Sequence, residues 1–166
     1  VTGVQTCALP IWVVFLAIMA MFLILFRSLK IAFVAILPSM LASGSVLGLM
    51  GWLGIPLDVM TITIAAICIG IGVDHSIHYI HRFRSEINQQ ASAKIAIERS
   101  HASTGKAIFY TSIIIIVGFS ILGLSNFIPT IYFGIFTAFA MLIALIANLT
   151  LLPLLLLGIN SGKIKT

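Results

Sequence analysis

The chain has 166 residues, of which 61% are hydrophobic and 8% are charged. Soluble domains are about 45–50% apolar and about 25% charged, so this composition excludes an ordinary soluble domain and predicts an all-α membrane protein. The net charge of +5 does not indicate a nucleic-acid partner, because the basic residues follow a membrane topology, as shown below.

The first eleven residues, VTGVQTCALPI, read as the conceptual translation of a common sequencing adapter. We therefore interpret residues 1–11 as non-native and leave them out of the fold argument. The alternative, a signal peptide, lacks a basic start and a convincing cleavage site. On this interpretation Cys7 has no meaning, and the native protein extends further at its N-terminus.

Five apolar segments follow. About 20 apolar residues cross a bilayer core of about 30 Å, and five segments reach or approach that length. We expect membrane-spanning helices at 12–26, 31–53, 59–81, 106–127 and 131–157. The first is short because the adapter segment truncates it.

The basic residues indicate one orientation for these helices. Every Lys and Arg lies in a connection at one end of the predicted bundle or in the tail 159–166, and the turns GIPLD and SNFIPT at the other end contain none. The positive-inside rule therefore places the basic connections and the tail in the cytoplasm. The basic residues are Arg27, Lys30, Arg82, Arg84, Lys94, Arg99, Lys106, Lys163 and Lys165.

Small residues and one long connection carry further predictions. Gly44 and Gly48 form a GxxxG pair, and with Gly70 they are predicted to let helices approach closely. In the connector 83–105, apolar residues recur every four positions, which favours an amphipathic helix along the cytoplasmic membrane surface. A solvated connector is the alternative. In either case Ser103–Gly105 is expected to break the helix before the fourth span.

Asp74 is the one charged residue inside the five predicted helices. At 1.5 Å per residue it lies roughly 12 Å inward from Arg82, within the hydrocarbon. An ionised carboxylate there costs on the order of 2.5–3.5 kcal/mol, and such residues are commonly functional, as in proton relays. Helical periodicity predicts that its stripe faces a partner helix or a wet crevice; the stripe holds Thr63, Gly70, Asp74, His78 and His81.

The predicted proton relay consists of Asp74, His75, His78, Thr111 and Ser112. His78 lies one turn from Asp74, whereas His75 points away from the stripe. Thr111 and Ser112 lie at similar depth, and their hydroxyls bond either to Asp74 or to the preceding turn of their own helix. A purely structural Asp74 is the alternative to a relay. No metal or cofactor is expected, because Asp74 and His78 have no further ligand cluster nearby.

Two stretches resemble a known family of transporters. GIGVDHSIHYIHRFRSE, residues 70–86, resembles the fourth-helix motif of the resistance-nodulation-division (RND) superfamily, in particular its MMPL-like exporters. GKAIFYTSIIIIVGFSILGLSNFIPTIYFGIFTAFAMLIALIANLTLLPLLLL, residues 105–157, resembles the fifth and sixth helices of the same proteins. The resemblance covers residues 12–157.

The resemblance implies an architecture and partners. Such transporters have two halves, each with one helix, a large extracytoplasmic domain and five further helices. The chain resembles the last five helices of one half, more like the C-terminal one, without the first helix and the extracytoplasmic domain. Its implied partners are the rest of the same transporter, membrane lipids and protons, with a homo-oligomer as an option and no nucleic acid.

The resemblance also implies a function. Family members are proton-driven secondary transporters that export hydrophobic or amphiphilic compounds or lipids, here across a bacterial or archaeal cytoplasmic membrane, and they are not enzymes. Asp74 occupies the position of the proton-coupling residue. Many MMPL-like members have a tyrosine next to it, where this chain has His75. The alternatives are a Sec-type protein-export auxiliary subunit and a sterol- or lipid-sensing membrane module without transport.

Overall fold

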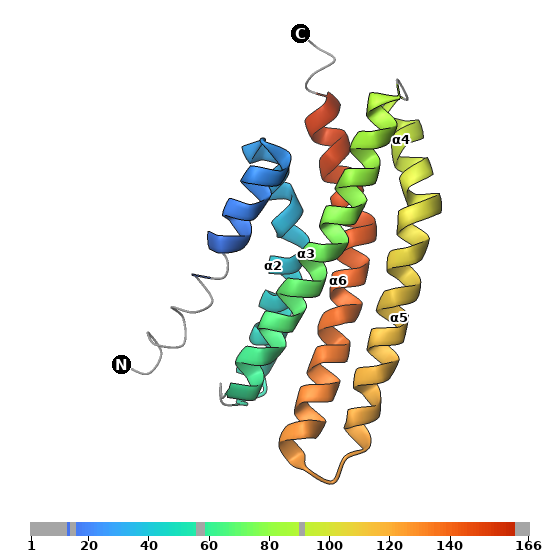
Figure 1. Cartoon of the computed structure of the whole chain (residues 1–166). Coiled ribbons are helices and arrows are strands. Elements are labelled where there is room, and N and C mark those ends of the chain that lie inside the picture. Colours follow the sequence, from blue (N-terminus) through green and yellow to red (C-terminus); the bar gives the residue numbers. More distant parts are fainter. Residues whose placement is uncertain (1–12, 14–15, 56–58, 90–91, 162–166) are drawn as a thin grey trace.

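The computed structural model describes residues 13, 16–55, 59–89 and 92–161. The adapter-like segment 1–11 and the end of the tail, 162–166, lie outside this part. The described residues form helices and no strand, and α6 packs against α2, α3 and α5 (Figure 1). In chain order the helices are Leu16–Phe26, α2 (Leu29–Trp52), α3 (Val59–Asn88), α4 (Ala93–Ser100), the π-helix η1 (His101–Gly105), α5 (Lys106–Ile121), the 3-10 helix η2 (Leu122–Leu124) and α6 (Ile128–Ser161).

The all-α membrane architecture expected from the sequence is confirmed. Four helical stretches in the described part are long and apolar enough to cross a membrane: Leu29–Trp52, Ile62–Asn88, Ala93–Leu124 and Ile128–Gly158. The helix Leu16–Phe26 is apolar but shorter. Each arises from a run of apolar residues whose backbone groups bond within the helix, as a bilayer requires.

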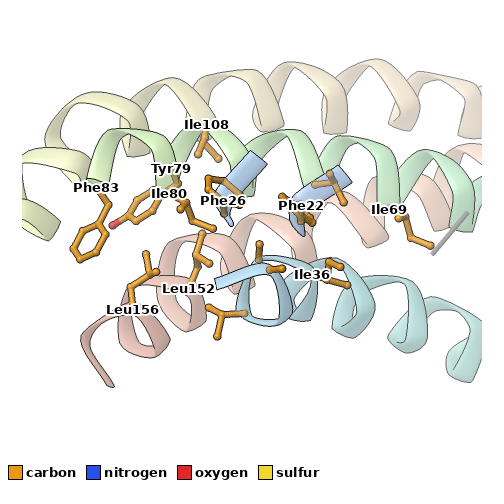
Figure 2. Close-up of a cluster of buried hydrophobic side chains, with 14 of the residues drawn as sticks. Phe22, Phe26, Ile36, Ile69, Tyr79, Ile80, Phe83, Ile108, Leu152 and Leu156 are labelled. Atoms are coloured by element: carbon orange, nitrogen blue, oxygen red, sulfur yellow. The ribbon is translucent and has the colours of Figure 1, made fainter. Parts of the chain in front are cut away.

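The side chains between the helices form two apolar clusters. One contains Phe22 and Phe26 of the first helix, which pack with Tyr79, Ile80 and other residues from α2, α3 and α6 (Figure 2). The other lies further from the basic connections and joins α2, α3 and α6. Its buried members are Ala42, Val46, Met50, Ile64, Cys68, Phe136, Ala140, Met141 and Ala144.

The end of α2 is set by a glycine. Gly54 has φ of 68°, which a residue with a side chain rarely adopts. The amide of Ile55 bonds to the carbonyl of Met50 at 3.0 Å, and that of Gly54 bonds to Gly51 at 3.3 Å. This is the Schellman pattern that satisfies the last carbonyls of a helix, and it stops α2 within one residue of its predicted end.

The connector 83–105 differs from its prediction. Residues 83–88 continue α3, and α4 runs through η1 into α5 as one helical stretch. Within the described residues of this region, the helices therefore extend α3 and α5. Ser103–Gly105 does not break the helix, because Gly105 keeps helical angles (φ −59°, ψ −41°). The Ser103 hydroxyl donates to the Arg99 carbonyl one turn earlier, at 2.8 Å.

Within the described part of the chain, the close helix approach occurs at a glycine other than the three predicted to pack. A Cβ at Gly44, Gly48 or Gly70 would meet no atom of the described chain within 4 Å. A Cβ at Gly72 would lie 2.5 Å from Ser39 Oγ and 3.2 Å from Ser39 Cβ. The close approach of α2 and α3 therefore depends on Gly72, and the GxxxG pair lies on an exposed face of α2.

Enlarging Gly72 is expected to destabilise the bundle, because a side chain there would force α2 and α3 apart. Overpacking of this kind costs about 1–3 kcal/mol. The Gly72→Leu variant should therefore unfold at a lower temperature in detergent micelles, whereas Gly44→Leu should unfold close to the unmodified chain. Equal destabilisation by the two variants would contradict this packing.

Candidate functional site

A groove separates α3 from the stretch formed by η1 and α5. Its volume is about 890 Å³. Polar residues of α3 on one wall include Asp74, His75, His78 and Arg82. The opposite wall carries hydroxyl side chains, namely Ser103, Thr104 and Thr111. The groove therefore brings together four of the five residues of the predicted relay.

Asp74 lies near the middle of α3. The helix has 30 residues, which makes it about 45 Å long at 1.5 Å per residue. Asp74 is therefore about 21–23 Å from either end of α3. Because the hydrocarbon core of a bilayer is only about 30 Å thick, a spanning α3 places this carboxylate within the core.

Asp74 and His78 form a pair on the groove wall. His78 Nε2 lies 3.4 Å from Asp74 Oδ1, one helical turn away, and the side chains are 67% and 66% exposed, respectively. The stripe predicted from helical periodicity is confirmed, since its residues are exposed while Ile69, Val73 and Ile80 on the other face are buried. The net charge of the pair inside the core is zero when an ionised Asp74 faces a protonated His78, and also when both side chains are neutral.

His75 occupies a different environment from its neighbours. Its side chain is 5% exposed, and its Nδ1 atom has no hydrogen-bond partner among the described residues. The residue nevertheless lines the groove with Asp74. An imidazole nitrogen that is buried without a partner normally receives one from water or from a neighbouring group, so His75 is a candidate proton carrier beside Asp74.

The two hydroxyl residues of α5 differ from each other. The Thr111 hydroxyl bonds to the carbonyls of Ala107 and Ile108, both at 3.0 Å, which is the intrahelical alternative weighed from the sequence. Ser112 is buried and its Oγ has no partner within the described chain. Ser112 does not lie among the groove-lining residues, because the next position on a helix points about 100° away from Thr111.

A buried hydrogen bond behind Asp74 was not predicted. The Ser76 hydroxyl lies 2.9 Å from Asn148 Oδ1 on α6 and 3.0 Å from the carbonyl of Gly72. Asn148 Nδ2 in turn donates to the Ala144 carbonyl at 3.0 Å. The signal in the sequence is that Ser76 and Asn148 are polar residues inside two predicted membrane-spanning helices. The bond fixes α3 against α6 on the side away from the groove.

Two contacts join the groove walls at the basic end of the bundle, by which we mean the end that carries Arg82 and Arg99. The Tyr79 hydroxyl lies 2.9 Å from His101 Nδ1, so α3 is hydrogen-bonded to η1. Glu86 of α3 pairs with Arg99 of α4. A π-helix is rare and frequently marks a functional site, and η1 here supplies Ser103 and Thr104 to the groove.

No metal site is found in the described part of the chain, since no group of three His, Cys, Asp or Glu side chains comes together there. The arrangement that remains is the pair of Asp74 and His78 on the wall of a groove, in a bundle of helices long enough to span a membrane. These features define a multi-pass membrane protein.

Comparison with known proteins identifies the family. Residues 4–162 match the model of the MMPL family, so the chain belongs to that family, whose members are membrane transporters of the RND superfamily. The resemblance recognised in the sequence is thereby confirmed. The match begins inside residues 1–11 and so does not separate the adapter-like segment from the rest.

Two relatives have similar sequences. A membrane protein of Methanocaldococcus jannaschii is 32% identical over 141 residues, which cover 85% of this chain and 36% of the relative. The membrane protein YdgH of Bacillus subtilis is 32% identical over 148 residues, which cover 86% of this chain and 17% of the relative. The chain thus spans well under half of either relative. No solved structure matched it.

The bond between Ser76 and Asn148 should be measurable as a coupling free energy. Side-chain hydrogen bonds between membrane helices contribute about 0.6 kcal/mol on average and at most about 1.7 kcal/mol. A double-mutant cycle of Ser76→Ala and Asn148→Leu, measured by unfolding in bicelles, should give a coupling within that range. A control cycle that pairs Ser76→Ala with Thr150→Val, which removes an exposed hydroxyl of α6, should give no coupling free energy. A coupling free energy of zero in the first cycle would show that this hydrogen bond does not stabilise the bundle.

Proposed function

We propose that this chain is the membrane part of a proton-driven secondary transporter, with Asp74 as the proton-coupling residue. The observation that carries the proposal is the position of Asp74: a carboxylate near the middle of a helix long enough to span a membrane, paired with His78 and open to a groove. A helix does not need a carboxylate to span a membrane, and a carboxylate inside the hydrocarbon costs free energy. Residues of this kind are therefore usually functional.

Proton transfer would work through a change of charge in the groove. With Asp74 ionised, the pair with a protonated His78 is an ion pair; with Asp74 neutral, that attraction is lost. One proton moving through 100 mV releases about 2.3 kcal/mol. Repeated exchange of this proton would alternate the preferred position of α3 relative to the facing wall, and so couple the gradient to movement of substrate elsewhere in the protein.

The proposal extends to the whole protein and its location. The rest of the longer chain, including its other half and its extracytoplasmic domains, would bind and move the cargo, which we propose to be hydrophobic or amphiphilic compounds or lipids leaving the cell. The membrane would be a bacterial or archaeal cytoplasmic membrane with the basic end inside, because in the sequence every Lys and Arg lies in the connections and tail predicted to be cytoplasmic. His75 would take the place of the tyrosine that many relatives of this type carry.

A second candidate is lipid sensing without transport. The groove also contains the apolar side chains of Ile71, Ile108 and Ile115, which suit an acyl chain or a sterol. Such a module would respond to lipid without using the proton gradient, so the experiment below separates the two functions.

The test is to replace the carboxyl group in the full-length parent protein. Asp74→Asn keeps the shape and removes the titrating proton, so proton-coupled efflux from vesicles should fall to background at normal expression. Glu98→Gln makes the same chemical change at an exposed position of α4 and should leave efflux unchanged. Normal efflux by Asp74→Asn would exclude Asp74 as the coupling residue, and gradient-independent lipid binding would favour sensing.

A further inference from the structure

Glu86 is a buried carboxylate at the basic end of the bundle. Its side chain is only 4% exposed. Arg82, one turn earlier on α3, places Nη2 2.7 Å from Glu86 Oε1, and Arg99 on α4 places Nη1 3.2 Å from Oε2. Each carboxylate oxygen thus has its own guanidinium partner. A charge buried to this degree persists only when it is paired in this way.

The two arginines connect Glu86 to both walls of the groove. Arg82 lines the groove on the α3 side. Arg99 belongs to α4, which continues without interruption into η1. Since η1 carries Ser103 and Thr104 on the opposite wall, the ion pair between Glu86 and Arg99 holds that wall against α3.

A second contact acts at the same place. Tyr79 is fully buried on α3 and bonds through its hydroxyl to His101, the first residue of η1. Within the described chain, α3 packs against α4 and η1 at the basic end, and the groove separates it from the facing residues of α5 further along. The walls are therefore joined at one end, and the position of that joint determines how wide the groove is beside Asp74.

We infer that Glu86 is a positioning residue that clamps the two walls of the groove together and limits access to it from the basic end. Arg99 is its partner on α4, and Arg82 holds the other carboxylate oxygen in place. The significance of this clamp for transport rests on the proposed function, but the clamp itself is a property of the groove. Breaking it should release η1 from α3 and expose Thr104, which is half-buried on the groove wall.

Cysteine labelling tests this directly in the full-length parent protein. A single cysteine is introduced by Thr104→Cys in a background without other cysteines, and its reaction rate with a charged maleimide is measured in membrane vesicles without a proton gradient. Glu86→Gln should raise the rate several-fold, and Glu86→Asp, which retains the charge, should bring it back towards the parent rate. Glu98→Gln, the matched change at an exposed carboxylate of α4, should leave the rate as in the parent.

A further variant guards against loss of folding. Arg99→Gln breaks the contact between the walls and leaves Glu86 paired with Arg82, so it should raise the rate in the same direction as Glu86→Gln. Unchanged labelling in both variants would overturn the inference. The labelling rate is measured without transport, so it tests the clamp alone, whereas efflux by Asp74→Asn tests proton coupling. Either proposal can therefore fail while the other holds.

Discussion

The structure depends on one constraint, which is that a carboxyl group lies in the middle of a helix long enough to span a bilayer. An ionised group at that depth loses most of its hydration, so its neighbours must provide either a counter-charge or a way for it to become neutral. His78 lies one turn away, where it would provide the first when protonated, and in the proposed function the groove would give a proton access for the second. The other features of the bundle can be understood by how they hold α3 so that this face remains open.

The two faces of α3 lie in different environments. One is fixed: its isoleucines are buried, Gly72 lies against Ser39 of α2, and Ser76 bonds to Asn148 of α6. The other carries Asp74 and faces the groove, whose far wall is joined to α3 at the basic end by the Tyr79–His101 and Glu86–Arg99 contacts. In the proposed function, this packed back and a facing wall joined at one end would let a change of charge at Asp74 move one helix without disturbing the packed core.

Much of this could be predicted from the sequence. The apolar runs predict the five apolar helical stretches and several of their limits, and the 3.6-residue period predicts the exposed stripe around Asp74. The end of α3 was missed because hydropathy falls at Arg82, whereas the backbone stays helical to Asn88, with no glycine or proline to stop it. Gly44 and Gly48 were chosen by spacing alone, which does not reveal which face meets a neighbour. The pairing of Glu86 with Arg99, and of Tyr79 with His101, depends on how α3 and α4 meet, which spacing does not specify.

The central claim is that Asp74 exchanges a proton while it lies inside the membrane. Infrared difference spectroscopy of the full-length protein in liposomes measures this exchange at the group itself, because a protonated carboxyl has a C=O stretch that the carboxylate lacks. The account predicts a carboxyl band that disappears as pH rises, shifts when water is replaced by D₂O, and is missing from Asp74→Asn. An identical spectrum for the parent and Asp74→Asn at every pH would contradict it.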